Sequence, residues 1–188
     1  EGYGRNSSWR GNREIWRDHR PGGKWRYCIP DMDRTFGNFA NAPRLAQLMG
    51  GDQVISRIRG NAQFKRLLAQ RYAAHLVTTF DETRMHGLID HFSGLMSPEL
   101  PRQRDRWSGV PGAVGYTASI QRMKNFVTAR SGDVIGEIQT VLELEPAVNL
   151  LLIAQGPGSF EIEGVPMEQG ALKVFPNIGL KIKAVPTP

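Results

Sequence analysis

The chain of 188 residues is long enough for one sizeable core, or for a domain followed by a small module. Hydrophobic residues make up 40% and charged residues 22%, which is ordinary for a soluble globular protein. No apolar run approaches the roughly 20 residues that a membrane helix requires, and the N-terminus does not resemble a signal peptide. Because the chain begins at Glu1 rather than Met, we expect a processed protein or an excised fragment.

The net charge of +6 is unevenly distributed along the chain. Residues 1–26 contain seven basic and three acidic groups, a balance of +4, whereas residues 133–188 contain three lysines and seven acids, a balance of −4. Tryptophans are interleaved with the basic residues, but no nucleic-acid motif is present, so we expect no specific nucleic-acid partner. The basic stretch is expected to face nucleotide phosphates or an acidic protein. The single cysteine, Cys28, excludes an intramolecular disulfide and leaves the redox compartment open.

The N-terminal region predicts a β-hairpin. A short strand is expected near residues 13–17, and the sequence Arg20-Pro-Gly-Gly23 is a strong turn signal. Residues 24–30 follow as a second strand, because aromatic and β-branched side chains alternate with less apolar ones. Trp16 and Trp25 are expected to be neighbours across this hairpin.

The second strand runs into two carboxylates, Asp31 and Asp33, with Phe36-Gly37 just beyond them. Two acids spaced in this way at the end of a strand can bind a hard cation such as Mg²⁺. A surface pair of acids that merely closes the strand is the alternative, and the motif by itself does not decide between the two.

From residue 41 to residue 145 the apolar residues recur at helical spacing, which predicts a mainly helical lobe. A loop is expected over residues 108–116, with one helix after it and a separate last helix that ends at Glu145-Pro146. The residues expected to open the successive helices are Asn41, Asp52, Asn61, Asp81, Ser97 and Ser131.

Beyond residue 146 the pattern changes to β. Strands are expected at residues 149–154, 160–162 and 180–184, with turns between them. About three strands are marginal alone, so we expect them to pack on the helical lobe or to continue in further chain. The predicted fold class is therefore α+β, with one domain over residues 1–145 and a small β module over residues 146–188.

The four histidines lack the spacing of metal ligands. His86 and His91 are five residues apart and fall on different faces of a helix, so packing or solvent contact is the expected role. No hydrolase elbow and no phosphate-binding glycine loop is present.

An ordered set of motifs over about residues 5–143 resembles the CotH-type kinase family of spore coat and bacterial surface proteins. The matching stretches near the N-terminus are Asn6-Ser-Ser-Trp-Arg-Gly-Asn12, Ile15-Trp-Arg17, Gly23-Lys-Trp-Arg26, Ile29-Pro-Asp-Met-Asp33 and Phe36-Gly37. Those in the helical region are Asn61-Ala-Gln-Phe64, Arg71-Tyr-Ala73, Ser97-Pro-Glu99, Arg106-Trp107, Lys124-Asn-Phe126 and Arg130.

The resemblance implies the C-terminal lobe of an atypical protein kinase that phosphorylates Ser or Thr of a protein partner with ATP and Mg²⁺. It implies that Asp31 or Asp33 binds the metal, with a slight preference for Asp31 because it follows the strand more directly. Asn12 suits a second metal contact, and Asn12 and Arg34 are the residues implied to bind the cofactor.

One position departs from the family pattern. Where the family usually has a catalytic Asp, this chain has Ser8, and a hydroxyl cannot replace a carboxylate as proton acceptor near neutral pH. The glycine-rich loop and strand lysine of a nucleotide-gripping lobe are also not found before this region. The alternative is therefore a catalytically inactive pseudokinase, a structural or binding module of a spore coat or cell surface.

Overall fold

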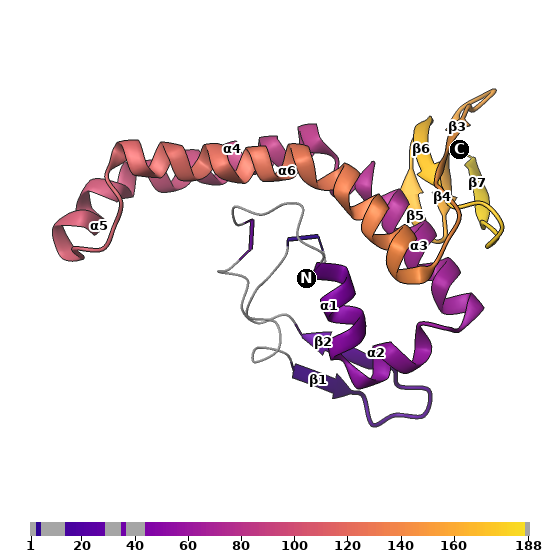
Figure 1. Ribbon diagram of the computed structural model, residues 1–188. Helices are drawn as coiled ribbons and strands as arrows, with labels where there is room; N and C mark the ends of the chain where they lie inside the picture. Colours follow the sequence, from indigo (N-terminus) through magenta and orange to yellow (C-terminus); the bar gives the residue numbers. More distant parts are fainter. Residues whose placement is uncertain (1–2, 5–13, 29–34, 37–43, 187–188) are drawn as a thin grey trace.

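The computed structural model describes residues 3–4, 14–28, 35–36 and 44–186 (Figure 1). Helices dominate the middle of the described chain, and small antiparallel sheets lie before and after them. The predicted α+β class is confirmed.

The N-terminal hairpin consists of β1 (Glu14–Arg17) and β2 (Trp25–Cys28), which pair antiparallel. Its turn is closed by the N–H of Gly23, which donates to the carbonyl of Arg20 at 2.9 Å. A Cβ on Gly23 would lie 2.1 Å from the carbonyl oxygen of Asp18, so only glycine fits at this point of the turn. The predicted hairpin and its turn are confirmed.

Three helices follow in chain order, α1 (Arg44–Gly51), α2 (Gln53–Ile58) and α3 (Ala62–Leu76). The Asp52 carboxylate accepts hydrogen bonds from two backbone amides at the start of α2, and the Asn61 amide oxygen accepts one from Phe64 at the start of α3. Both predicted caps are confirmed. The predicted cap Asn41 lies outside the described residues.

A long arm projects from the body of the molecule (Figure 1). It consists of α4 (Glu82–Met96), the short 3-10 helix η1 (Ser97–Glu99), α5 (Leu100–Arg106) and the first half of α6 (Ala113–Leu142). Asp81 caps α4 as predicted, since its carboxylate accepts from the N–H of Arg84. Helices α4 and α6 lie side by side and antiparallel, and α5 lies at the far end of the arm.

Helix α6 differs from the sequence prediction in two ways. It begins at Ala113, inside the expected loop of residues 108–116, and it continues without a break through Ser131, which was expected to cap a separate helix. The predicted break at Ser131 is wrong. The apolar face that includes Val127 and Val134 is continuous across this point and is fully buried, so tertiary packing overrides the local capping signal of Ser131-Gly132.

The described part of the C-terminal module, residues 146–186, contains five strands, not about three. They are β3 (Val148–Leu152), β4 (Gly158–Ile162), β5 (Val165–Met167), β6 (Gly170–Val174) and β7 (Ile182–Pro186). Strand β3 pairs with β6, and β4 lies between β5 and β7, all antiparallel. Strands β5 and β6 were not predicted. They lie within or directly after residues 164–170, where the glycines and Pro166 favoured a turn.

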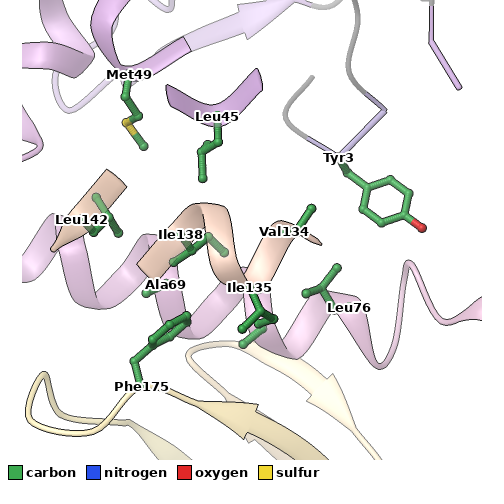
Figure 2. Packing of buried hydrophobic residues seen from close by; sticks show 11 residues of the cluster. Tyr3, Leu45, Met49, Ala69, Leu76, Val134, Ile135, Ile138, Leu142 and Phe175 are labelled. Atoms are coloured by element: carbon green, nitrogen blue, oxygen red, sulfur yellow. The ribbon is translucent and has the colours of Figure 1, made fainter. Parts of the chain in front are cut away.

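The main core lies where α6 passes between α1 and α3. Figure 2 shows Leu45 and Met49 of α1 on one side of α6, with Ala69 of α3 and Phe175 on the other. Helix α6 contributes the side chains between them, Val134, Ile135, Ile138 and Leu142. The C-terminal half of α6 is therefore the centre of the hydrophobic core.

The β module packs on α3, which is one of the two outcomes that the sequence left open. Its own apolar cluster includes Ala74 of α3, which is fully buried. The Gln70 amide nitrogen donates to the carbonyls of Phe175 at 2.9 Å and Gly179 at 2.8 Å, and its oxygen accepts from the N–H of Phe175 at 3.1 Å. Arg66 and the buried Glu163 form an ion pair at 3.0 Å. These polar contacts fix the module on the helix.

Candidate functional site

The residues predicted to carry the chemistry lie on two short stretches of chain, 5–13 and 29–34. Ser8, Asn12, Asp31, Asp33 and Arg34 all lie outside the described residues. The structure does describe the framework at both ends of these stretches, which consists of the hairpin on one side and Tyr3, Gly4, Thr35 and Phe36 on the other.

The outer ends of the two stretches are joined by a backbone hydrogen bond. The N–H of Phe36 donates to the carbonyl of Gly4 at 2.9 Å. Phe36 has a φ of 53°, a left-handed conformation that is uncommon for a bulky residue. Such a conformation persists where surrounding contacts hold it, and here the surroundings are aromatic. The chain therefore enters stretch 5–13 and leaves stretch 29–34 at neighbouring points.

An aromatic cluster anchors this closure to the helices. The Tyr3 ring stacks on Phe80 with centroids 4.3 Å apart and planes 8° apart. Phe36 meets the Phe126 ring edge to face at 5.4 Å, and Tyr3 also contacts both Phe36 and Phe126. Aromatic pairs of this geometry contribute about 0.5–1.5 kcal/mol each beyond the area they bury. We call residues 4–36, which contain both stretches and the hairpin between them, the candidate segment. The cluster connects this segment to α6 through Phe126.

A buried ion pair on α6 reinforces the anchor. Arg130 is fully buried, and its Nη1 lies 2.5 Å from Oε1 of Glu137, two helical turns further along the same face. The Arg130 Nε donates to the carbonyl of Tyr3 at 3.0 Å, and the second Glu137 oxygen accepts from the N–H of Leu45 at 2.9 Å. One ion pair thus binds the backbone of Tyr3, directly before stretch 5–13, and the backbone of Leu45 at the start of α1.

The surroundings of this ion pair are shielded from water. Burial raises the pKa of the Tyr3 hydroxyl to about 12, against smaller opposing contributions from Ser131 and Arg130. Burial likewise raises the pKa of Tyr72, again against an opposing contribution from Arg130. Both phenols are neutral at physiological pH, so neither adds a charge beside the buried Arg130–Glu137 ion pair.

The inner ends of the two stretches are joined by the hairpin. In its register Glu14 lies opposite Cys28, and the pairing continues to Arg17 opposite Trp25. Asn12 comes two residues before Glu14, and Asp31 comes three residues after Cys28. The stretches that carry Asn12 and Asp31 therefore also begin from paired positions at the open end of the hairpin.

Each tryptophan of the hairpin has an arginine as its cross-strand partner. The Arg26 guanidinium lies 5.5 Å from the Trp16 ring centre, and the Arg17 guanidinium lies 6.0 Å from the Trp25 ring centre. The expectation that Trp16 and Trp25 are cross-strand neighbours is wrong, because they occupy adjacent pairs in the register and so point to opposite faces. Each face of the hairpin presents one tryptophan–arginine cation–π pair.

The turn of the hairpin borders a basic hollow of about 510 Å³, lined by Trp16, Asp18, Arg20, Gly22, Gly23, Lys24 and Arg26. Asp18 and Arg20 form an ion pair with each other at 2.5 Å. Lys24 and Arg26 add two further positive charges to the hollow. Its chemistry suits an anionic group, in agreement with the basic surface expected from the sequence.

The described residues contain no group of three His, Cys, Asp or Glu side chains that could hold a metal. The Nε2 of His86 lies 3.1 Å from the carbonyl of Lys124, and the Nδ1 of His75 lies 2.9 Å from the Thr79 hydroxyl. Burial lowers the pKa of His75. Both histidines therefore contact neighbouring protein groups.

Comparison with known protein families supplies the assignment that the framework alone does not. The model of the family described as CotH kinase protein matches residues 3–133, more than half of the chain. The chain belongs to the CotH kinase protein family. No curated protein and no solved structure matched the chain in the same comparisons.

The CotH match begins at Tyr3 and ends within α6. It contains the Gly4–Phe36 closure, the hairpin and the anchor residues Phe126 and Arg130. Membership of the CotH family confirms the suspected resemblance, and a kinase family agrees with the use of ATP and Mg²⁺. No helix among the described residues is long and apolar enough to cross a membrane.

Phe126 and Arg130 belong to the family pattern in the sequence, but the framework that they form was not predicted. Glu137 and Tyr3 were missed altogether. The usable signal was the charge of Arg130 and Glu137, seven residues apart on a helical face that is otherwise apolar. Two opposite charges on a buried face predict an internal ion pair.

Proposed function

We propose that this chain carries the metal-binding and nucleotide-binding part of a CotH-type kinase that transfers phosphate from ATP to Ser or Thr of a protein partner. Asp31 and Asp33 would supply carboxylate oxygens to Mg²⁺, and Asn12 would supply an amide oxygen. Oxygen donors of this kind are those that Mg²⁺ prefers. Arg34 would contact the nucleotide phosphates.

The observation that carries this proposal is the double closure of the candidate segment. Gly4 is hydrogen-bonded to Phe36 at one end, and Glu14 is paired with Cys28 at the other. Ser8 and Asn12 belong to the stretch between Gly4 and Glu14, and Asp31 and Asp33 belong to the stretch between Cys28 and Phe36. The two stretches are thus joined to each other at both ends, which supports the convergence of these side chains.

The chemistry of phosphoryl transfer fits this set of residues. The reaction depends mainly on positioning and on neutralising the charge of the phosphates. When bound, Mg²⁺ would supply that neutralisation of charge. The carboxylates of the chain would hold the metal, and the basic groups of Arg34 and the hairpin would favour an anionic ligand.

Ser8 limits the proposed activity. A serine hydroxyl is not a proton acceptor near neutral pH, and general-base assistance typically contributes about 10²–10⁴-fold to a rate. We therefore infer weak phosphate transfer. The second candidate is a pseudokinase that binds nucleotide but does not transfer phosphate. Ser8 also favours this second candidate. Its role would be that of a structural or binding module in a coat or surface assembly.

Calorimetric titration of the intact protein with ATP in the presence of Mg²⁺ tests the metal site. Asp31→Asn and Asp33→Asn should each weaken binding at least tenfold, since each removes a charged metal ligand. Asp105→Asn is a matched control, because Asp105 is exposed on α5 in the arm. The proposal is wrong if the wild-type protein does not bind the nucleotide, or if all three variants bind it equally.

Restoring the missing carboxylate separates the active kinase from the pseudokinase. Ser8→Asp should raise the rate of phosphate transfer from radiolabelled ATP to protein acceptors by at least tenfold, whereas Ser8→Asn should leave it unchanged. Nucleotide binding without transfer in both the wild type and Ser8→Asp would favour the pseudokinase.

The cellular setting is also a proposal. The CotH family is associated with spore coat proteins, which supports placement in a spore coat, and a bacterial cell surface is the wider possibility. A protein substrate or coat partner agrees with a kinase-like family. The basic hollow at the hairpin would favour an acidic partner.

A further inference from the structure

The edges of the sheets in the β module are protected unequally. Four strands border an edge in the described structure, because β3 and β6 form a two-stranded sheet and β5 and β7 flank β4. An edge strand presents unpaired backbone N–H and C=O groups, and natural proteins guard such edges with lysine, proline or other charges. The residues of each edge strand therefore indicate which edges resist pairing with another strand.

Three of the four edge strands carry these protective residues. Strand β5 contains Pro166, and β6 contains the exposed Lys173. Strand β7 contains both Lys183 and Pro186. These three edges are disfavoured as partners for another strand, since proline removes a donor and lysine places a charge beside the incoming chain.

Strand β3 has no such protection. From Val148 to Ala154 the chain has neither a charged residue nor a proline. Leu152 faces the core of the module, while Leu151 and the following Ile153 are 63% and 67% exposed. Among the described residues β3 pairs only with β6, so its other edge is open. An uncharged, leucine-rich open edge is the feature expected of a strand that pairs with another chain.

We propose that β3 pairs edge to edge and antiparallel with β3 of a second copy of this chain. An antiparallel strand pair has a two-fold axis, so one sequence can meet itself in a closed dimer. Like charges placed opposite each other would oppose this arrangement. None arise here, because the nearest charged residues in the chain are Glu145 and Glu161, outside the uncharged stretch.

Pairing with a second copy also brings exposed apolar side chains of β3 next to each other. In an antiparallel arrangement around the middle of β3, the two Leu151 side chains lie on the same face near the axis, together with Ile153 of each copy. The two-stranded β3–β6 sheets of the two copies then form one four-stranded sheet across the axis. A strand from a different protein would need a matching uncharged sequence, whereas the second copy supplies it by symmetry.

The mass of the intact protein in solution tests the proposal. Light scattering after size exclusion, over a dilution series up to about 100 μM, should show a monomer–dimer equilibrium. Leu151→Lys should weaken dimerisation by about tenfold or more, because it places like charges close to the axis. Ile182→Lys is the matched control: Ile182 is also an exposed apolar residue of an edge strand, but β7 is already protected.

Hydrogen exchange provides the second measurement. Alternate backbone amides of residues 148–153 should gain protection as the protein concentration rises, and this gain should disappear in Leu151→Lys. Circular dichroism checks that both lysine variants are folded. A wild-type protein that stays monomeric, equal dimerisation of wild type and Leu151→Lys, or open-ended association instead of a dimer would each overturn the proposal.

Discussion

The two halves of α6 belong to one continuous helix but have opposite surroundings. The C-terminal half, from Phe126 onward, lies in the core and contains the buried residues Val127, Arg130 and Ile138. The N-terminal half, from Ala113, lies in the projecting arm beside α4, and Val114 at its start is 86% exposed. The helix is the same in both halves, so the difference comes from what packs against it.

The contacts of the two halves differ in kind as well as in amount. In the arm, Lys124 pairs with the exposed Asp90 of α4 at 2.6 Å, and the Tyr116 hydroxyl donates to the carbonyl of Ser93 at 3.2 Å. In the core half, Arg130 and Glu137 are shielded from solvent and form hydrogen bonds with the backbone of Tyr3 and of Leu45. The same type of ion pair should therefore matter greatly in one half and little in the other.

The largest effect is expected from Arg130. Arg130→Met should lower the free energy of unfolding by about 3–5 kcal/mol, because it leaves the Glu137 carboxylate buried without its cation. Urea unfolding followed by circular dichroism measures this change. The Arg130→Met/Glu137→Gln double variant should recover part of the loss, since the uncompensated charge is gone.

Arg102→Met is the matched control for Arg130. Arg102 also pairs with a carboxylate, that of Glu99 at 2.8 Å, but on the exposed surface of the arm. Its removal should cost less than about 1 kcal/mol. Equal effects of the two arginine substitutions would mean that ion pairs in the core and in the arm do not differ as described.

A smaller effect is expected at the contact between α3 and the β module. Gln70→Leu leaves the buried N–H and carbonyl of Phe175 without their partner, and should cost about 1–3 kcal/mol. Limited proteolysis should then cut faster near residues 145–147, which is the domain boundary proposed from the sequence. Gln63→Leu, at an exposed position of the same helix, should change neither measurement.

The pH dependence of the free energy of unfolding tests whether the surroundings of Arg130 and Tyr3 are shielded from water. The folded pKa of Tyr3, raised by burial from 10.0 to about 12, means that the folded state holds its proton more tightly than the unfolded state. Stability should therefore fall as the pH rises from about 10 to 12, with a contribution of about 1–2 kcal/mol from this group. Tyr3→Phe keeps the ring stacked on Phe80 and should flatten the profile. An unchanged profile would contradict the shielding of this site.

The smallest effect is expected in the arm. Asp90→Ala removes the exposed ion pair with Lys124 and should change the free energy of unfolding by less than about 1 kcal/mol. Glu137→Ala, the corresponding loss of a carboxylate paired with a cation of α6, should cost several times more. Thermal unfolding of the two variants side by side gives the comparison.

Local signals in the sequence were sufficient for much of the fold. The turn at Arg20–Gly23 and the caps Asp52, Asn61 and Asp81 act through backbone geometry and hydrogen bonds within a few residues, so they could be read directly. Ser131 was misleading for the opposite reason. It resembles a cap, but the helix around it is held by contacts with distant parts of the chain.

The ordered motifs of about residues 5–143 indicated the family, because they depend only on residue types and their spacing, and the family model matches residues 3–133. The sequence also determined the hairpin, the starts of α2, α3 and α4, and the α+β class. The tertiary structure alone decided that Arg130 and Glu137 lie inside the core, that Gly4 meets Phe36, and that Trp16 faces Arg26. Some of these contacts join residues far apart in the chain, up to 127 positions for Arg130 and Tyr3. Others depend on strand register. Register and long-range burial are set by the whole core together, and no local pattern encodes them.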